Sequence, residues 1–214
     1  MRKPCHTTRI HHGDSTVKKP ENTTELLKRL PETGKIQRNS LRQETQRIFL
    51  EDCPTYFWTK PASSTGKYHP KDHTGAYGLW IHTKRAFTAY ERLARSYESA
   101  DRINSFEKEC GKAAILLHDI FKYGRPPEHS GHTVSDHDRI AHRYLEQNAD
   151  LPEEVLGCID SHNGPWGKGK APETELEQLH HTADMQASDR NSFFKILQPH
   201  SRIQPILGTP DHER

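Results

Sequence analysis

The sequence predicts an all-α fold, because apolar residues recur at three- and four-residue spacing in successive segments of its second half. No segment shows the sustained alternation of apolar and polar residues that is typical of a half-buried strand. Hydrophobic residues make up only 31% of the 214 residues, below the usual ~45–50%, a figure that includes glycine. We therefore expect a helical bundle with part of the chain outside its core, as a mostly irregular N-terminal extension.

The first 76 residues carry few helical signals. Residues 1–38 are polar and basic and contain three prolines, so we expect a flexible segment. Residues 39–76 contain the apolar pattern of one short helix, from Ser40 to about Leu50, followed by a polar loop. We expect this helix and loop to pack on the core.

Residues 77–190 are expected to form the main domain. Its helices follow from apolar spacing, from a cap at Ser135 or Asp136, and from Pro152 at a first-turn position. The expected helices are 82–97, 106–120, one that follows Ser135 or Asp136, one that opens at Pro152, and 173–190. Residues 191–214 are expected to form a tail that packs back on the bundle.

Composition argues against several classes of protein. A net charge of +2, from 31 basic and 29 acidic residues, gives no long-range field that favours nucleic acid. The four cysteines are scattered without a C-x-x-C pair, which fits neither a disulfide framework nor a zinc ribbon. No apolar run approaches the ~18–20 residues of a membrane helix, and no signal peptide follows Met1. We expect a cytoplasmic protein without membrane association.

The most informative motif is the doublet His118-Asp119, which closes the apolar run of residues 106–120. Imidazoles and carboxylates are the ligands that divalent transition metals prefer. In a helix the two side chains project about 100° apart, so an ion near the helix end can take one on each flank. Other helices must then complete the site, and His82 and Asp184 are the first candidates. The sequence therefore predicts a metal centre inside the bundle.

The order of these residues resembles that of the HD-domain metal-dependent phosphohydrolases, a helical superfamily. The resemblance covers about residues 77–190 and is carried by three motifs, which are Gly78-Leu79-Trp80-Ile81-His82-Thr83, Leu116-Leu117-His118-Asp119-Ile120-Phe121-Lys122 and Ala183-Asp184.

The resemblance implies one or two divalent transition ions, of Mn, Fe, Co, Ni or Zn. Members with two metals have two more histidines between the doublet and the last aspartate, where this chain has His132 and His162. Asp119 would then bridge the ions. His132 competes with His129 and His137 for its role.

Several neighbouring residues are weighed as alternatives or as structural residues. Asp189 competes with Asp184, but the Ala183-Asp184 context favours Asp184. His180 and His181 are interpreted as polar surface. Trp80 and Trp166 are interpreted as partly buried core residues rather than as stacking platforms.

Five residues are candidates for binding a phosphate group. Lys122 lies one turn after the doublet and is assigned a catalytic role together with Asp119; Arg125 is similarly placed. Ser63, Ser64 and Lys67 lie in a loop that resembles a segment before the first ligand in some HD proteins of phages and prokaryotes.

The expected activity is hydrolysis of a phosphate ester or phosphoanhydride bond (EC 3.1) in a nucleotide or another small phosphate ester. One alternative is a nuclease for single-stranded nucleic acid, with the basic N-terminal segment on the phosphate backbone. The other is a catalytically weak HD fold that binds a ligand or a protein partner. The sequence does not predict an oligomeric state.

Overall fold

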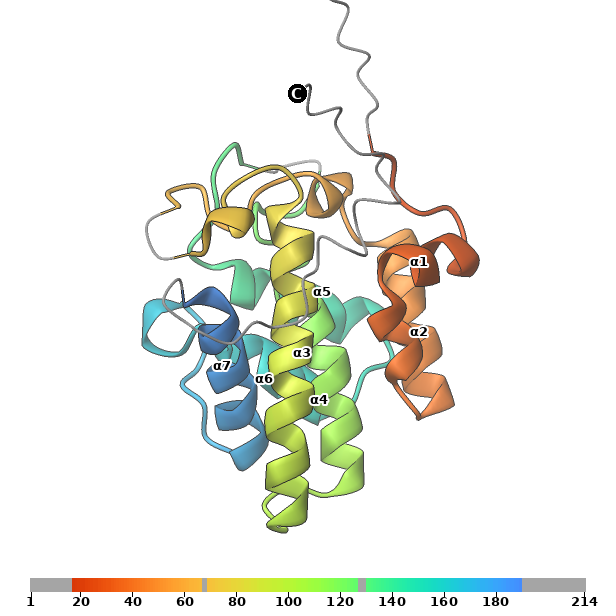
Figure 1. Ribbon diagram of the computed structural model, residues 1–214, viewed down its shortest axis with the longest axis vertical. Helices are drawn as coiled ribbons and strands as arrows, with labels where there is room; N and C mark the ends of the chain where they lie inside the picture. Colours follow the sequence, from red (N-terminus) through yellow and green to blue (C-terminus); the bar gives the residue numbers. More distant parts are fainter. Residues whose placement is uncertain (1–16, 67–68, 127–129, 190–214) are drawn as a thin grey trace, which may run out of the picture.

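A computed structural model of the chain describes residues 17–66, 69–126 and 130–189 (Figure 1). Within these ranges the chain forms α-helices and short 3₁₀ helices and no strand, which confirms the all-α prediction. The α-helices are α1 (Thr23–Arg29), α2 (Asn39–Glu51), α3 (Gly78–Ser99), α4 (Ser105–Leu117), α5 (His137–Asn148), α6 (Glu153–Ser161) and α7 (Glu175–Ser188). The 3₁₀ helices are η1 (Pro31–Lys35), η2 (Thr55–Trp58), η3 (Lys71–His73) and η4 (Gly164–Trp166).

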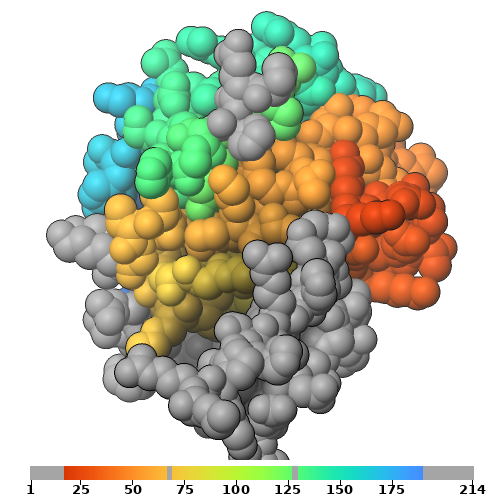
Figure 2. Space-filling view, turned by 90° about the horizontal axis from the view of Figure 1, so that it is seen from above, coloured from red at the N-terminus to blue at the C-terminus, as the bar shows by residue number. Residues whose placement is uncertain are grey.

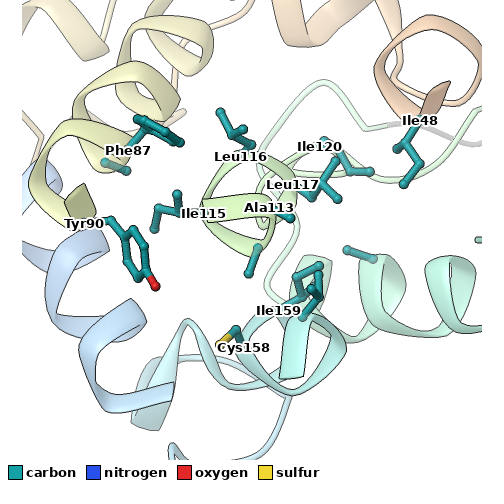
Figure 3. Close-up of a cluster of buried hydrophobic side chains, with 14 of the residues drawn as sticks. Ile48, Phe87, Tyr90, Ala113, Ile115, Leu116, Leu117, Ile120, Cys158 and Ile159 are labelled. Atoms are coloured by element: carbon teal, nitrogen blue, oxygen red, sulfur yellow. The ribbon is translucent and has the colours of Figure 1, made fainter. Parts of the chain in front are cut away.

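The centre of the bundle is α4, whose residues from Glu109 to Leu117 are all buried. It packs on α3, α6 and α7, while α5 packs on α6. Figure 3 shows Ile115 of α4 near Phe87 of α3, and Ile159 of α6 on another side of the same helix. The charged residues among the buried residues of α4, Glu109 and Lys112, pair with each other at 2.6 Å, and the others, apart from Gly111, are apolar, as expected for a helix at the core.

Two helix starts are fixed by reciprocal capping. The side chain of Asn104 accepts a hydrogen bond from the backbone N–H of Glu107, and Glu107 in turn accepts one from Asn104, which begins α4. Thr174 and Glu177 form the same capping box at the start of α7. These contacts satisfy N–H groups that have no partner inside the helix.

Helix α3 begins at Gly78, four residues earlier than expected. A side chain at Gly78 would meet the backbone carbonyl of His73, so glycine permits the loop and the helix start to approach closely. This contact places η3 directly against the beginning of α3.

Residues 23–36 depart from the flexible segment expected for residues 1–38. Leu26, Leu30 and Ile36 are completely buried in the core, and the side chain of Asn22 caps α1. Three apolar residues are too few to give a strong periodic pattern, but burying each contributes about 1.5–3 kcal/mol. Residues 1–16 lie outside the described residues.

The loop after α2 also contributes to the core. The ring of Phe49 lies 5.4 Å from that of Phe57, and the ring of Trp58 lies 5.3 Å from that of Trp80. Trp80 is a core residue, as expected, and it is completely rather than partly buried. The expected tail, residues 191–214, lies outside the described residues. Of the helices in the described part of the chain, none has the length and apolar character to cross a membrane.

Candidate metal centre

Helix ends and helix starts bring six buried ligand-type side chains together. They are His82 in α3, His118 and Asp119 at the end of α4, His137 at the start of α5, His162 after α6 and Asp184 in α7. Five of them are residues that the sequence singles out. The sixth, His137, is one of three histidines that the sequence leaves in competition for a single ligand position, the others being His129 and His132.

The first group consists of His82, His118 and Asp184, whose donor atoms lie within 4.8 Å of one another. The Nε2 atoms of the two histidines are 3.3 Å apart. Oδ1 of Asp184 lies 3.0 Å from Nε2 of His82 and 3.5 Å from Nε2 of His118. One ion can therefore reach all three donors.

The second group consists of Asp119, His137 and His162, with donor atoms again within 4.8 Å. Oδ1 of Asp119 lies 3.0 Å from Nε2 of His137 and 3.4 Å from Nε2 of His162. The two Nε2 atoms are 3.1 Å apart.

Asp119 faces both groups. While its Oδ1 atom faces the second group, its Oδ2 atom lies 3.6 Å from Nε2 of His82 and 3.6 Å from Nε2 of His118. A carboxylate with one oxygen toward each group has the arrangement needed to bridge two cations.

The hydrogen bonds of three histidines fit a metal site. Each places its Nδ1 atom within hydrogen-bond distance of the carbonyl three residues earlier, at 2.7–2.9 Å. The pairs are His118 with Ile115, His137 with Val134 and His162 with Ile159. A proton on Nδ1 leaves a lone pair on Nε2, which is the usual state of a metal-binding histidine. Lone pairs that face each other at about 3 Å repel, and a cation between them removes the repulsion.

The charge states of Asp119, Asp184 and His137 also suit metal binding. Burial alone would raise the pKa of Asp119, but Lys122 and the nearby imidazoles outweigh it and hold the pKa well below its usual value. Asp184 has its pKa held low in the same way by His118 and His82. Burial, together with Lys122, lowers the pKa of His137 to about 4. At neutral pH the centre therefore offers ionised carboxylates and a neutral His137, the forms that bind metals.

His132 is not brought to this centre. Its side chain is exposed in the turn before α5, whereas His137 is buried in the first turn of that helix. The ligand candidates His118 and His162 lie at helix ends. The position of His137 next to the predicted cap, Ser135 or Asp136, was therefore the feature of the sequence that favoured His137 over His132. His129, the third competitor, lies outside the described residues.

The interpretation of His180 as polar surface is wrong. It is completely buried, and its ring centroid lies 5.7 Å from that of His118. It therefore packs behind a ligand candidate, one turn before Asp184. His181 is half-buried, and its Nδ1 atom lies 2.6 Å from the carbonyl oxygen of His162, which it can hold in place.

The phosphate-binding candidates are placed differently from one another. Nζ of Lys122 lies 3.0 Å from Oδ1 of Asp119 and 3.0 Å from Nε2 of His137. Arg125 is not brought to the centre, because it is exposed and lies over the ring of Tyr144 at 4.3 Å. Lys67 lies outside the described residues.

A solvent-accessible cavity of about 260 Å³ adjoins the second group. Its lining includes Ser63, His69, Lys122, His137, Asn163 and Trp166. The hydroxyl of Ser64 lies 3.0 Å from that of Thr133, another lining residue. Figure 2 shows this end of the molecule, where the loop before α3 lies beside the segment before α5.

Trp166 is not a core residue, contrary to the expectation. Its side chain is 73% exposed, and its ring stacks on that of His181 with centroids 6.1 Å apart. Trp166 thus presents an aromatic surface at the edge of the cavity.

The comparisons agree with this geometry. The family model described as "HD domain" matches residues 79–192, just over half of the chain. No curated protein and no solved structure matches the chain significantly.

Proposed function

The chain belongs to the HD-domain family, and from that premise we propose that it hydrolyses a phosphate ester or phosphoanhydride bond of a nucleotide-type substrate. The observation that carries the proposal is the position of Asp119. This carboxylate turns one oxygen to each of two histidine pairs, beside a cavity that has Lys122 in its wall.

The donors fit two divalent transition ions. His82, His118 and Asp184 would hold one, His137 and His162 the other, and Asp119 would reach both. Imidazole donors favour Mn, Fe, Co, Ni or Zn over Mg, which prefers oxygen. When bound, such ions lower the pKa of a water molecule toward ~7 and neutralise charge on a phosphate.

Lys122 would bind the phosphate group. Its ammonium lies against the second group and lines the cavity, so a phosphate seated there meets a fixed positive charge. Fixed charges directed at developing negative charge supply a large part of such catalysis. The Ser63 hydroxyl, in the same cavity wall, can donate a hydrogen bond to a phosphate oxygen.

The exposed side chain of Trp166 favours a nucleotide over a small aliphatic phosphate as the substrate. The cavity of about 260 Å³ can take a phosphate and part of a sugar, which leaves the base at the rim, where the exposed indole lies. Stacking between a base and an aromatic side chain is worth ~1–3 kcal/mol.

The nuclease alternative has less support. It depends on the basic N-terminal segment, and several of these side chains are bound to their own protein. Lys19 donates to the carbonyl of Glu51, Lys35 pairs with Glu91, and Arg38 lies over the ring of Phe106.

The proposal is tested by elemental mass spectrometry and by phosphate release from nucleotides. Asp119→Ala is expected to lose bound transition metal and to release phosphate at least ~10³-fold more slowly. Asp150→Ala, which alters an exposed carboxylate, should match the wild type in both. Full metal content in Asp119→Ala, or no phosphate release by the wild type with Mn, Co or Ni, would contradict the proposal.

A further inference from the structure

A third group of imidazoles lies next to the first. It consists of His69, His73 and His82, and one ring nitrogen of each lies within 4.8 Å of the other two. The ring centroids of His69 and His73 lie 5.7 Å and 5.3 Å from that of His82. The first two belong to the loop before α3 and to η3, and the centre described above uses neither of them.

Four ring nitrogens of this histidine triad lack a hydrogen-bond partner among the described residues. His73 is completely buried, and neither of its ring nitrogens has a hydrogen-bond partner among the described residues. The buried Nδ1 atoms of His69 and His82 also lack one there. Buried polar atoms are nearly always satisfied, so three such imidazoles side by side indicate a ligand that they share.

The backbone of His73 is held firmly in place. Its N–H donates to the carbonyl of Pro70 at 2.9 Å, and its carbonyl accepts from the N–H of Ala62 at 2.8 Å. Gly78 packs directly against it. His73 is therefore held beside His82 by its backbone contacts, before any ligand binds.

We propose that His69, His73 and His82 bind a further divalent transition cation, separate from the two ions assigned to the groups that contain Asp184 and Asp119. To serve two ions His82 must lose its remaining N–H proton to solvent and bridge them as an imidazolate; its Nε2 atom faces Asp184, and its Nδ1 atom has no partner among the described residues. A donor set of imidazoles alone selects zinc, cobalt or nickel over magnesium or calcium.

Such an ion would also act on the cavity. His69 lines it together with Lys122, so a cation held by His69 adds positive charge to the wall of the cavity. The ion would strengthen binding of highly charged phosphate groups without any contribution from Asp119.

The test is the zinc content of the full chain after loading with Zn²⁺ and removal of free metal. His69→Ala alters a half-buried side chain, and His73→Phe keeps a buried ring while removing both nitrogens. The control is His132→Ala, which removes an exposed imidazole. We expect about one zinc fewer per chain in the first two variants than in the wild type and in the control.

A second series separates this inference from the proposed function. Asp119→Ala should retain the zinc of the triad, and Asp119→Ala/His69→Ala should lose it. Loss of one zinc in His69→Ala supports the triad even if the wild type hydrolyses no nucleotide. Equal zinc content in wild type, His69→Ala and His73→Phe overturns it, whether or not the protein is a hydrolase. If His73→Phe fails to fold by circular dichroism, His69→Ala decides the result.

Discussion

Lys84 of α3 and Glu32 of η1 form an ion pair of 2.8 Å in which the two side chains are only 4% and 5% exposed. Lys84 also donates to the carbonyl of Arg29 at 3.2 Å. The pair fastens the N-terminal segment to the longest helix of the bundle. Removal of one partner from a buried ion pair is costly because it leaves an uncompensated charge.

Glu32→Ala is therefore expected to lower the free energy of unfolding by about 3–5 kcal/mol. The double variant Glu32→Leu/Lys84→Met should recover much of this loss, because neither charge then remains buried. Urea denaturation measures both. A loss below about 1 kcal/mol, as for an exposed pair, would show that the segment is not held in this way.

His137 and His132 form a matched pair of variants. His137→Ala should reduce metal content and lower the rate of phosphate release by more than the ~10–100-fold typical of residues behind a ligand. His132→Ala should leave both unchanged, because its side chain is exposed. The reverse result would restore His132 as the ligand.

Lys122→Ala should lower kcat by ~10²–10³-fold, the usual effect of removing a group that stabilises developing negative charge. Metal content should stay at the wild-type level, because Lys122 contacts Asp119 but offers no lone pair in its charged form. Metal loss as large as in Asp119→Ala would instead show that Lys122 only positions a ligand.

Trp166→Ala should raise KM for nucleotides by roughly 5–150-fold, the equivalent of ~1–3 kcal/mol of stacking. Trp166→Phe should recover part of the loss, and a sugar phosphate without a base should respond to neither change. An equal effect on both kinds of substrate would argue against stacking.

Glu177 is expected to make the free energy of unfolding decrease as the pH falls through the acid range. Burial alone would raise its pKa, but Lys170 and the N–H groups of Glu173 and Thr174 outweigh it, so that the pKa is lowered. A lowered pKa contributes stability above the unfolded value of ~4.3, and the contribution is lost as pH falls through the folded value. Unfolding free energies between ~pH 6 and ~pH 3 should therefore fall more steeply in wild type than in Glu177→Gln. Parallel curves would contradict this assignment.

The helices from α3 to α7 were predictable because apolar periodicity records which face of each helix is buried. The N-terminal helix was not, since burial of Leu26, Leu30 and Ile36 depends on a surface that other segments provide. The same limit applies to the boundary of α3, where Gly78 permits close packing against His73.

The ligand candidates likewise divide into those that the sequence could predict and those that it could not. His118-Asp119 and Asp184 stand in recognisable motifs, whereas His137 depends on where a helix begins. His73 carries no motif, and only the packing of η3 against α3 brings it near His82. The spacing of His73 and His82 in the sequence therefore does not predict that their rings lie close together.

The close packing of η3 and of the N-terminal segment has a consequence for the size of the folding unit. The stretch that the family shares begins at residue 79, yet Leu26, Trp58 and other earlier residues belong to the same hydrophobic core. A fragment cut at the family boundary would expose that core and lose two of the three histidines of the triad. The part of this chain that must fold as one unit is therefore larger than the part that the family model matches.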